Sequence, residues 1–142
     1  MTATMTLPAG GPPPLPDASA ACNFLRSQKR WLVHGLLHAE DPVVVATILE
    51  MHDSSHHLWL LLLGSVRRFS PPAARQLTDL YAYHGLIAGS LERNLERDLA
   101  WTIRARVCSL LARRLEQITD DAVDAVESLH TRLASLGELR AR

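Results

Sequence analysis

Hydrophobic side chains recur three or four positions apart over much of the chain, which is the spacing of an amphipathic helix. The first such segment begins near Asp17 or Ser19 and extends to about Ala39. A second begins at Asp41-Pro42, where aspartate can cap a helix and proline suits its first position. The valines at 43–45 favour a strand by propensity, but the apolar residues that follow keep a helical register. We therefore expect two successive helices here.

The next segment combines an interruption with a very apolar run. Asp53, Ser54 and Ser55 predict an interruption of the second helix, because their side chains compete for backbone hydrogen bonds. Residues 58–66 are then apolar on every face of a helix. A helix of this kind is expected in the centre of a bundle.

A long apolar seam dominates the second half of the chain. Ser70-Pro71 predicts a helix start, and apolar residues follow from Leu77 to Ile118, first at heptad and then at four-residue spacing. That change makes the seam drift around the helix. We therefore expect two helices, or one with a bend, with the break near Gly85 or Gly89.

The chain ends in a further apolar stripe. Thr119 is expected to cap a last helix, because acidic residues that the helix dipole favours follow it, and Gly137 is expected to end that helix. The pattern as a whole predicts an all-α fold: a four- to five-helix bundle with one long, kinked or broken helix. Residues 1–18 are expected to form a disordered Pro-rich arm, residues 19–137 the helical domain and residues 138–142 a frayed tail.

Composition narrows the classes of function. Lysine and arginine together number 15, as do aspartate and glutamate, so the surplus of cations that binds nucleic acid is missing and we do not expect such a partner. The longest apolar run is too short to span a bilayer, and no secretory signal is visible. Of the two cysteines, Cys22 and Cys108, Cys108 lies among apolar helical residues and is expected to be a buried, reduced thiol. We expect a cytoplasmic protein without a membrane span.

Histidine is the unusual residue of this chain, because five of the seven histidines lie between residues 34 and 57. His34 with His38, and His52 with His56, are four residues apart, so each pair shares one helix face. Two imidazoles at that spacing can bind one metal ion. These four residues are therefore our candidate metal ligands, for a divalent transition metal; we expect no other cofactor. The alternative is that the pairs flank a core and bind nothing.

His84 lies within the apolar seam that follows Ser70-Pro71. A polar residue in such a seam can fix helix register or act as a pH switch, but we expect its polar edge to reach the surface. Signatures of catalysis are missing: the chain has no G-x-S-x-G, P-loop or G-x-G-x-x-G motif. We therefore expect that the protein is not an enzyme.

The length of the apolar seam predicts what the domain does. It is more extensive than a small monomeric bundle needs, so we expect a non-enzymatic regulatory or protein–protein interaction module that acts through helix packing. Its partner would be itself, as a homo-oligomer, or another helical protein. The alternative is a metal- or ligand-responsive helical sensor that uses the histidines between residues 34 and 57.

Overall fold

The computed structural model describes the backbone of residues 18–96 and 101–141, and the side chains of residues 19–93 and 105–136. Its elements are, in order, α1 (Ala18–Leu37), α2 (Pro42–Ser54), α3 (His56–Phe69), α4 (Pro71–Glu96) and α5 (Trp101–Ala141). No strand occurs in this part of the chain, so the predicted all-α fold is confirmed. Of the predicted arm, residues 1–17 lie outside the described residues, and Ala18 already belongs to α1.

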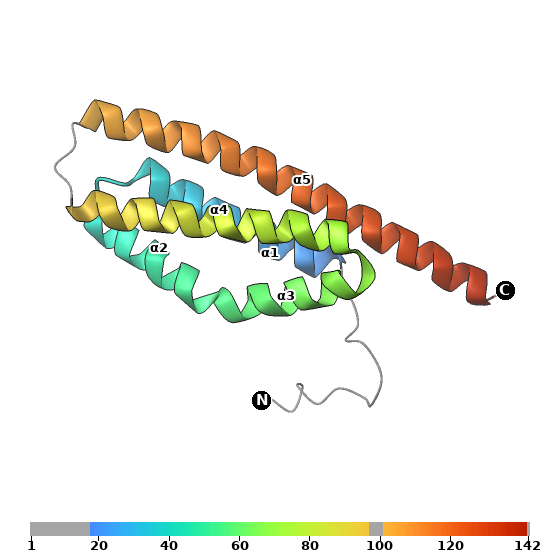
Figure 1. Cartoon of the computed structure of the whole chain (residues 1–142). Helices are drawn as coiled ribbons and strands as arrows, with labels where there is room; N and C mark the ends of the chain where they lie inside the picture. The colour runs from blue at the N-terminus through green and yellow to red at the C-terminus, as the bar shows by residue number, and fades with distance from the viewer. Residues whose placement is uncertain (1–17, 97–100, 142) are drawn as a thin grey trace.

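The helices form a bundle in which neighbouring legs run in opposite directions (Figure 1). α2 and α3 follow one another in the same general direction and together make one leg, and α4 returns beside them. α5 packs against α1 and α4, and its C-terminal part continues past the other helices. α1 packs closely against α5 but has little direct contact with α3. This uneven packing leaves one side of the bundle less tightly closed.

The boundary between α2 and α3 lies where the sequence predicts an interruption. Ser54 Oγ donates to the Glu50 carbonyl at 2.8 Å, and Ser55 Oγ donates to the His52 carbonyl at 2.9 Å. Two successive hydroxyl groups that bond back to the preceding turn can bend a helix. Ser55 is itself buried, so the bend is held inside the bundle and changes the direction of α3.

Two helix starts follow their sequence signals. Asp41 Oδ1 accepts hydrogen bonds from the backbone N–H groups of Val43 and Val44, at 3.0 and 3.4 Å. Ser70 Oγ accepts one from the N–H of Ala73 at 3.3 Å, ahead of Pro71 in α4. Each cap satisfies donors that the first turn of a helix leaves unpaired. Both predicted starts are therefore confirmed.

α1 and α2 meet closely at only part of their length. A Cβ atom on Gly35 would lie 3.1 Å from Ile48 Cγ1, so the glycine allows the two backbones to approach there. The core continues from this contact through side chains of all the helices, among them Leu25, Leu36, Val45, Trp59, Leu77, Leu80, Leu115 and Val126.

The break between α4 and α5 lies at a different position from the one that the sequence predicts. The division of the long seam into two helices is confirmed, but α4 passes through Gly85 and Gly89 and ends at Glu96. A glycine inside a helix costs only about 1 kcal/mol, which the fully buried Ile87 and Leu91 on the same helix can offset. A break at either glycine would expose these side chains.

α5 is continuous where the sequence predicts a new helix at residue 119. Thr119 is fully buried within α5, and its hydroxyl donates to the Leu115 carbonyl at 2.7 Å. The prediction that Thr119 caps a helix was wrong, because a threonine inside a helix can satisfy its hydroxyl on the preceding turn. α5 also continues to Ala141, past the stop expected at Gly137.

The apolar run at 58–66 does not lie in the centre of the bundle, which corrects a second prediction. α3 forms part of an edge leg: Trp59, Leu62, Leu63 and Val66 are buried, whereas Leu58, Leu60 and Leu61 are 51%, 52% and 43% exposed. Only one side of α3 faces α4 and the core. The remaining leucines therefore face solvent in the single chain.

Candidate functional site

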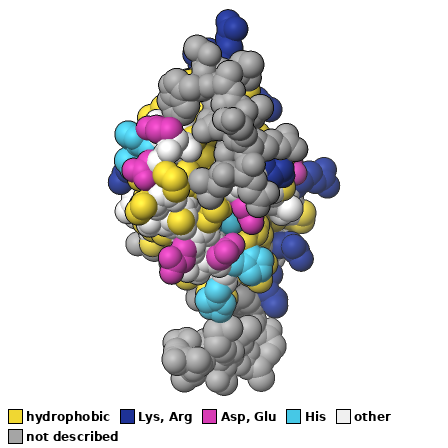
Figure 2. Space-filling model, turned by 90° about the vertical axis from the view of Figure 1, so that its left-hand side faces the viewer, with side chains coloured by type: hydrophobic (Ala, Val, Ile, Leu, Met, Phe, Trp, Pro, Cys, Tyr) yellow, Lys and Arg dark blue, Asp and Glu magenta, His cyan; other side chains and the backbone are white. Residues whose placement is uncertain are grey.

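The first histidine pair lies on an exposed surface at the end of α1. The ring centroids of His34 and His38 are 4.5 Å apart, as their spacing predicts, and both residues are exposed. His38 Nδ1 lies 3.9 Å from Glu40 Oε1. The same end of the bundle exposes Leu37 and Val43, and Figure 2 shows hydrophobic, acidic and histidine side chains together on it.

The second pair meets α4 at Tyr81. His56, the first residue of α3, forms a hydrogen bond between its Nδ1 and the Tyr81 hydroxyl. The ring centroids of His52 and His56 lie 5.9 and 5.7 Å from that of Tyr81. Tyr81 therefore contacts one imidazole from each side of the bend at Ser55, His52 of α2 and His56 of α3.

The four predicted metal ligands are thus distributed as two pairs with different neighbours. Among the described side chains, no three His, Cys, Asp or Glu residues group together in a way that could hold a metal ion. Each pair offers two imidazoles, and a metal would have to complete its shell with other ligands. Metal binding by His34, His38, His52 and His56 stays a prediction.

Behind His52 and His56 lies an aromatic cluster, which consists of the buried Trp59 and His84 and the half-buried Tyr81. Trp59 stacks on Tyr81 with ring centroids 4.8 Å apart, and it meets His84 edge-on at 5.0 Å. Phe24 of α1 also contacts Trp59, with ring centroids 5.3 Å apart. The cluster therefore links α1, α3 and α4 through ring contacts.

Several polar atoms of this region lack a hydrogen-bond partner among the described residues. They are His52 Nδ1, Trp59 Nε1 and both ring nitrogens of His84. His84 is fully buried, so the expectation that its polar edge reaches the surface was wrong. The seam that carries His84 faces α3, whose Trp59 covers the imidazole. Unpaired buried polar atoms lower the stability of the fold.

Burial also changes the protonation of these groups. It lowers the pKa of His84 from its ordinary value of 6.5 to about 3, and the nearby His52 adds to the decrease. Burial lowers the pKa of His52 as well, against an opposing effect from Asp53. Desolvation disfavours the charged imidazolium. His84 is therefore neutral at every pH at which the protein would normally be handled.

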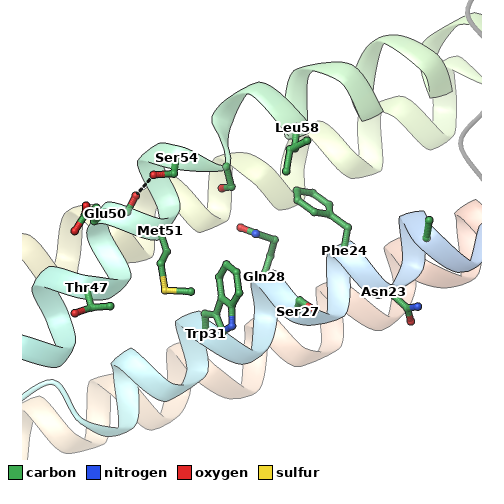
Figure 3. Close-up of a pocket in the computed structure, with 12 residues that line it drawn as sticks. Asn23, Phe24, Ser27, Gln28, Trp31, Thr47, Glu50, Met51, Ser54 and Leu58 are labelled. Atoms are coloured by element: carbon green, nitrogen blue, oxygen red, sulfur yellow. Dashed lines mark hydrogen bonds between the residues drawn. The ribbon is translucent and has the colours of Figure 1, made fainter. Parts of the chain in front are cut away.

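A groove lies between α1 and the α2–α3 leg, on the side where the bundle is loosely closed (Figure 3). Its volume is about 580 Å³. The lining residues come from all three helices: Ala20, Asn23, Phe24, Ser27, Gln28, Trp31, Thr47, Glu50, Met51, Ser54, Ser55 and Leu58. A smaller cavity of about 250 Å³ continues it along α3 and shares Ala20, Phe24 and Leu58 with it. We refer to the larger cavity as the α1 groove.

Sequence reasoning missed the residues that give these sites their character. Tyr81 and Trp59 become neighbours of the histidines only through tertiary packing. Gln28 had a visible signal, because it stands four residues after Phe24 and three before Trp31, within an apolar helical stripe. A polar residue in such a stripe is expected to be buried, and Gln28 is 5% exposed.

Among the described residues, no helix is both long enough and apolar enough to cross a membrane. Comparison with protein-family models, with curated proteins and with solved structures finds no match to this chain.

Proposed function

We propose that the protein is a non-enzymatic interaction or regulatory module that acts through helix packing, and that its partner is a second copy of the same chain. The observation that supports this proposal is the outer face of α3. There Leu60 and Leu61 are about half exposed, and a Cβ atom added to Gly64, one turn further on, would meet nothing within 4 Å. We call these three residues the α3 leucine face.

The chemistry of this face suits another helix. Leucine side chains gain about 1.5–3 kcal/mol each on full burial, so contact with an apolar partner would recover part of that free energy. Gly64 adds a flat position at which a second backbone could approach. A two-fold contact places the same face on both chains, so a self-complementary face needs no other partner.

Charge placement favours an antiparallel arrangement of the two α3 helices. Asp53 lies near the N-terminal end of α3, one residue before α2 ends, and Arg68 lies near the C-terminal end of α3, so an antiparallel crossing brings Asp53 of one chain toward Arg68 of the other. Both are exposed, and neither forms an ion pair with another described residue. Opposite charges at the rim of an interface favour one orientation over the other.

Sedimentation equilibrium tests the proposal, at protein concentrations that extend high enough to detect a weakly associating dimer. Leu60→Glu should raise the dimer dissociation constant at least about ten-fold, because the interface would bury an unpaired carboxylate. Leu110→Glu is the matched control: Leu110 is 59% exposed, but it lies on α5, away from α3. Circular dichroism of both variants should match that of the wild type.

A charge exchange tests the orientation. Arg68→Asp should weaken the dimer, and the double variant Asp53→Arg/Arg68→Asp should restore it, since each ion pair is re-formed with the signs reversed. A wild-type protein that stays monomeric up to millimolar concentration would contradict self-association. Equal effects of Leu60→Glu and Leu110→Glu would exclude the α3 leucine face.

A metal-responsive sensor is the second candidate, and the contact of His52 and His56 with Tyr81 favours it. This contact already holds two imidazoles next to each other, which lowers the entropy lost on metal binding. The purified protein would be titrated with zinc, nickel and copper and compared with His34→Ala, His52→Ala and His56→Ala. Stoichiometric binding that only the last two variants lose would support a site at Tyr81; binding that all three retain would contradict it.

A further inference from the structure

The α1 groove has the size of a small-molecule site. Its volume of about 580 Å³ falls within the range of roughly 300–1,000 Å³ that is usual for pockets that enclose a ligand. The adjoining cavity beside Leu61 and Leu62 adds an apolar extension. The groove is present because α1 and α2 approach closely at Gly35 and Ile48 and then diverge toward the bend at Ser55.

One polar side chain points into this groove without a partner. Figure 3 shows Gln28 extending from α1 into the space between Met51 and Phe24. The residue is 5% exposed, and no described residue forms a hydrogen bond with its amide. Its amide atoms are not among the described polar atoms that are both buried and unpaired, so the amide is accessible to solvent through the groove. A ligand that offers a donor or an acceptor there would replace solvent as the partner of the amide, since an amide can both donate and accept.

The walls beside Gln28 are apolar and partly aromatic. Figure 3 shows that Trp31 and Phe24 extend from α1 into the same space, with Met51 and Leu58 contributed by the opposite leg. Aromatic rings offer flat surfaces for stacking, and the thioether of methionine adapts to the outline of a bound ring. This combination favours a flat aromatic body over a flexible polar one.

Charge excludes one class of ligand. Among the described residues that line the groove, Glu50 is the charged one, and no lysine or arginine is present to balance a bound anion. Burying an anion without a countercharge is strongly unfavourable. A carboxylate or phosphate ligand therefore does not suit this groove.

We propose that the α1 groove binds a neutral, flat aromatic molecule with a single hydrogen-bonding group, which pairs with the Gln28 amide while the ring packs against Trp31, Phe24 and Met51. The α1 groove shares no lining residue with the α3 leucine face, although Leu61 of that face also lines the adjoining cavity, and the proposed binding does not require self-association. Gln28 is the residue that selects for the polar group.

Three related probes test the proposal on the full chain: 2-naphthol, which is neutral and carries one hydroxyl; 2-naphthoate, which is anionic; and 2-methylnaphthalene, which has no hydrogen-bonding group. Binding is followed by ¹H–¹⁵N NMR through the side-chain amide of Gln28 and the indole N–H of Trp31. We expect saturable shifts at both groups with 2-naphthol, and a dissociation constant at least about thirty-fold higher for 2-naphthoate, because of the cost of burying the charge.

Gln28→Leu separates the hydrogen bond from the apolar contact. It should raise the dissociation constant of 2-naphthol roughly three- to ten-fold, as expected for one neutral hydrogen bond, and leave that of 2-methylnaphthalene unchanged or lower. The matched control is Gln76→Leu, because Gln76 is exposed on α4 and does not line the groove. Leucine has a similar size to glutamine and favours a helix, so the variant is expected to fold.

Three results would overturn the proposal. The first is an absence of saturable binding of 2-naphthol at millimolar concentration. The second is equal affinity for 2-naphthol and 2-naphthoate. The third is a Gln28→Leu variant that weakens both neutral probes equally, which would show a general loss of groove structure. Sedimentation of the wild type with and without 2-naphthol distinguishes a failure of this site from a failure of self-association.

Discussion

Replacement of His84 by leucine should make the protein more resistant to acid. His84 is fully buried against Trp59 of α3, and neither ring nitrogen has a partner among the described residues. Besides burial, His52 of α2 contributes to the lowering of the pKa of His84. Leucine has a similar volume, carries no polar atom and favours a helix, so His84→Leu removes the titratable group without opening a large cavity.

The magnitude follows from the pKa of His84. In the unfolded chain the imidazole binds a proton as the pH falls through 6.5, whereas in the folded protein its pKa is about 3. Because the unfolded state then binds more protons, stability is lost as the pH falls below 6.5. At pH 4.5, two units below the ordinary value, the loss is about 3 kcal/mol, at about 1.4 kcal/mol per unit. The lowered pKa of His52 acts in the same direction.

Urea unfolding of the wild type and of His84→Leu at pH 7.5 and pH 4.5 measures this difference. When the pH is lowered from 7.5 to 4.5, the free energy of unfolding of the variant should rise by about 3 kcal/mol relative to that of the wild type. Carboxylates that titrate in the same range affect both proteins equally, so their contribution cancels in the difference. His130→Leu is the control, because His130 is exposed on α5. If the wild type and His84→Leu lose stability in parallel as the pH falls, then His84 is not a buried neutral imidazole.

Three further changes test how the fold is held together, each by urea unfolding followed by circular dichroism. Asp41→Ala should lower the free energy of unfolding by about 1 kcal/mol, because it removes the acceptor for two N–H groups of α2; no loss would show that the cap is unimportant. Gly85→Ala should raise it by about 0.5–1 kcal/mol, since the new Cβ meets nothing within 4 Å in mid-helix; destabilisation would contradict a continuous α4. Leu115→Ala should cost about 2–5 kcal/mol, because Leu115 is fully buried; a cost below 1 kcal/mol would place it outside the core.

The helix starts could be predicted because their causes are local. Asp41 and Ser70 accept hydrogen bonds from residues two or three positions further on, so the relevant contacts are visible in a short window of sequence. Thr119 has the same kind of side chain but bonds to the preceding turn. Which of the two bonds forms depends on whether α5 must stay continuous to pack against α1 and α4, and a local window does not contain that information.

Only the contacts within a single helix of the candidate sites could be predicted from the sequence, because contacts between helices depend on tertiary packing. Spacing within one helix correctly placed His34 beside His38, and it placed His52 near His56. It could not identify Tyr81 as their shared neighbour, because that residue comes from α4. The α1 groove depends on how far α1 and α2 diverge beyond Gly35, which is a property of packing and not of either helix alone.

The run at residues 58–66 shows where a failed prediction is informative. A helix that is apolar on all sides is expected to be enclosed on all sides, yet α3 lies at an edge of the single chain and leaves Leu58, Leu60 and Leu61 about half exposed. The all-apolar pattern of α3 is consistent with its edge position if another molecule covers its outer face. Leu58 borders the α1 groove, while Leu60 does not line it, so a small ligand would cover the former and a second chain the latter. The two proposals therefore account for different leucines of one helix, and Leu58→Glu and Leu60→Glu should separate them: the first should abolish 2-naphthol binding and the second should dissociate the dimer.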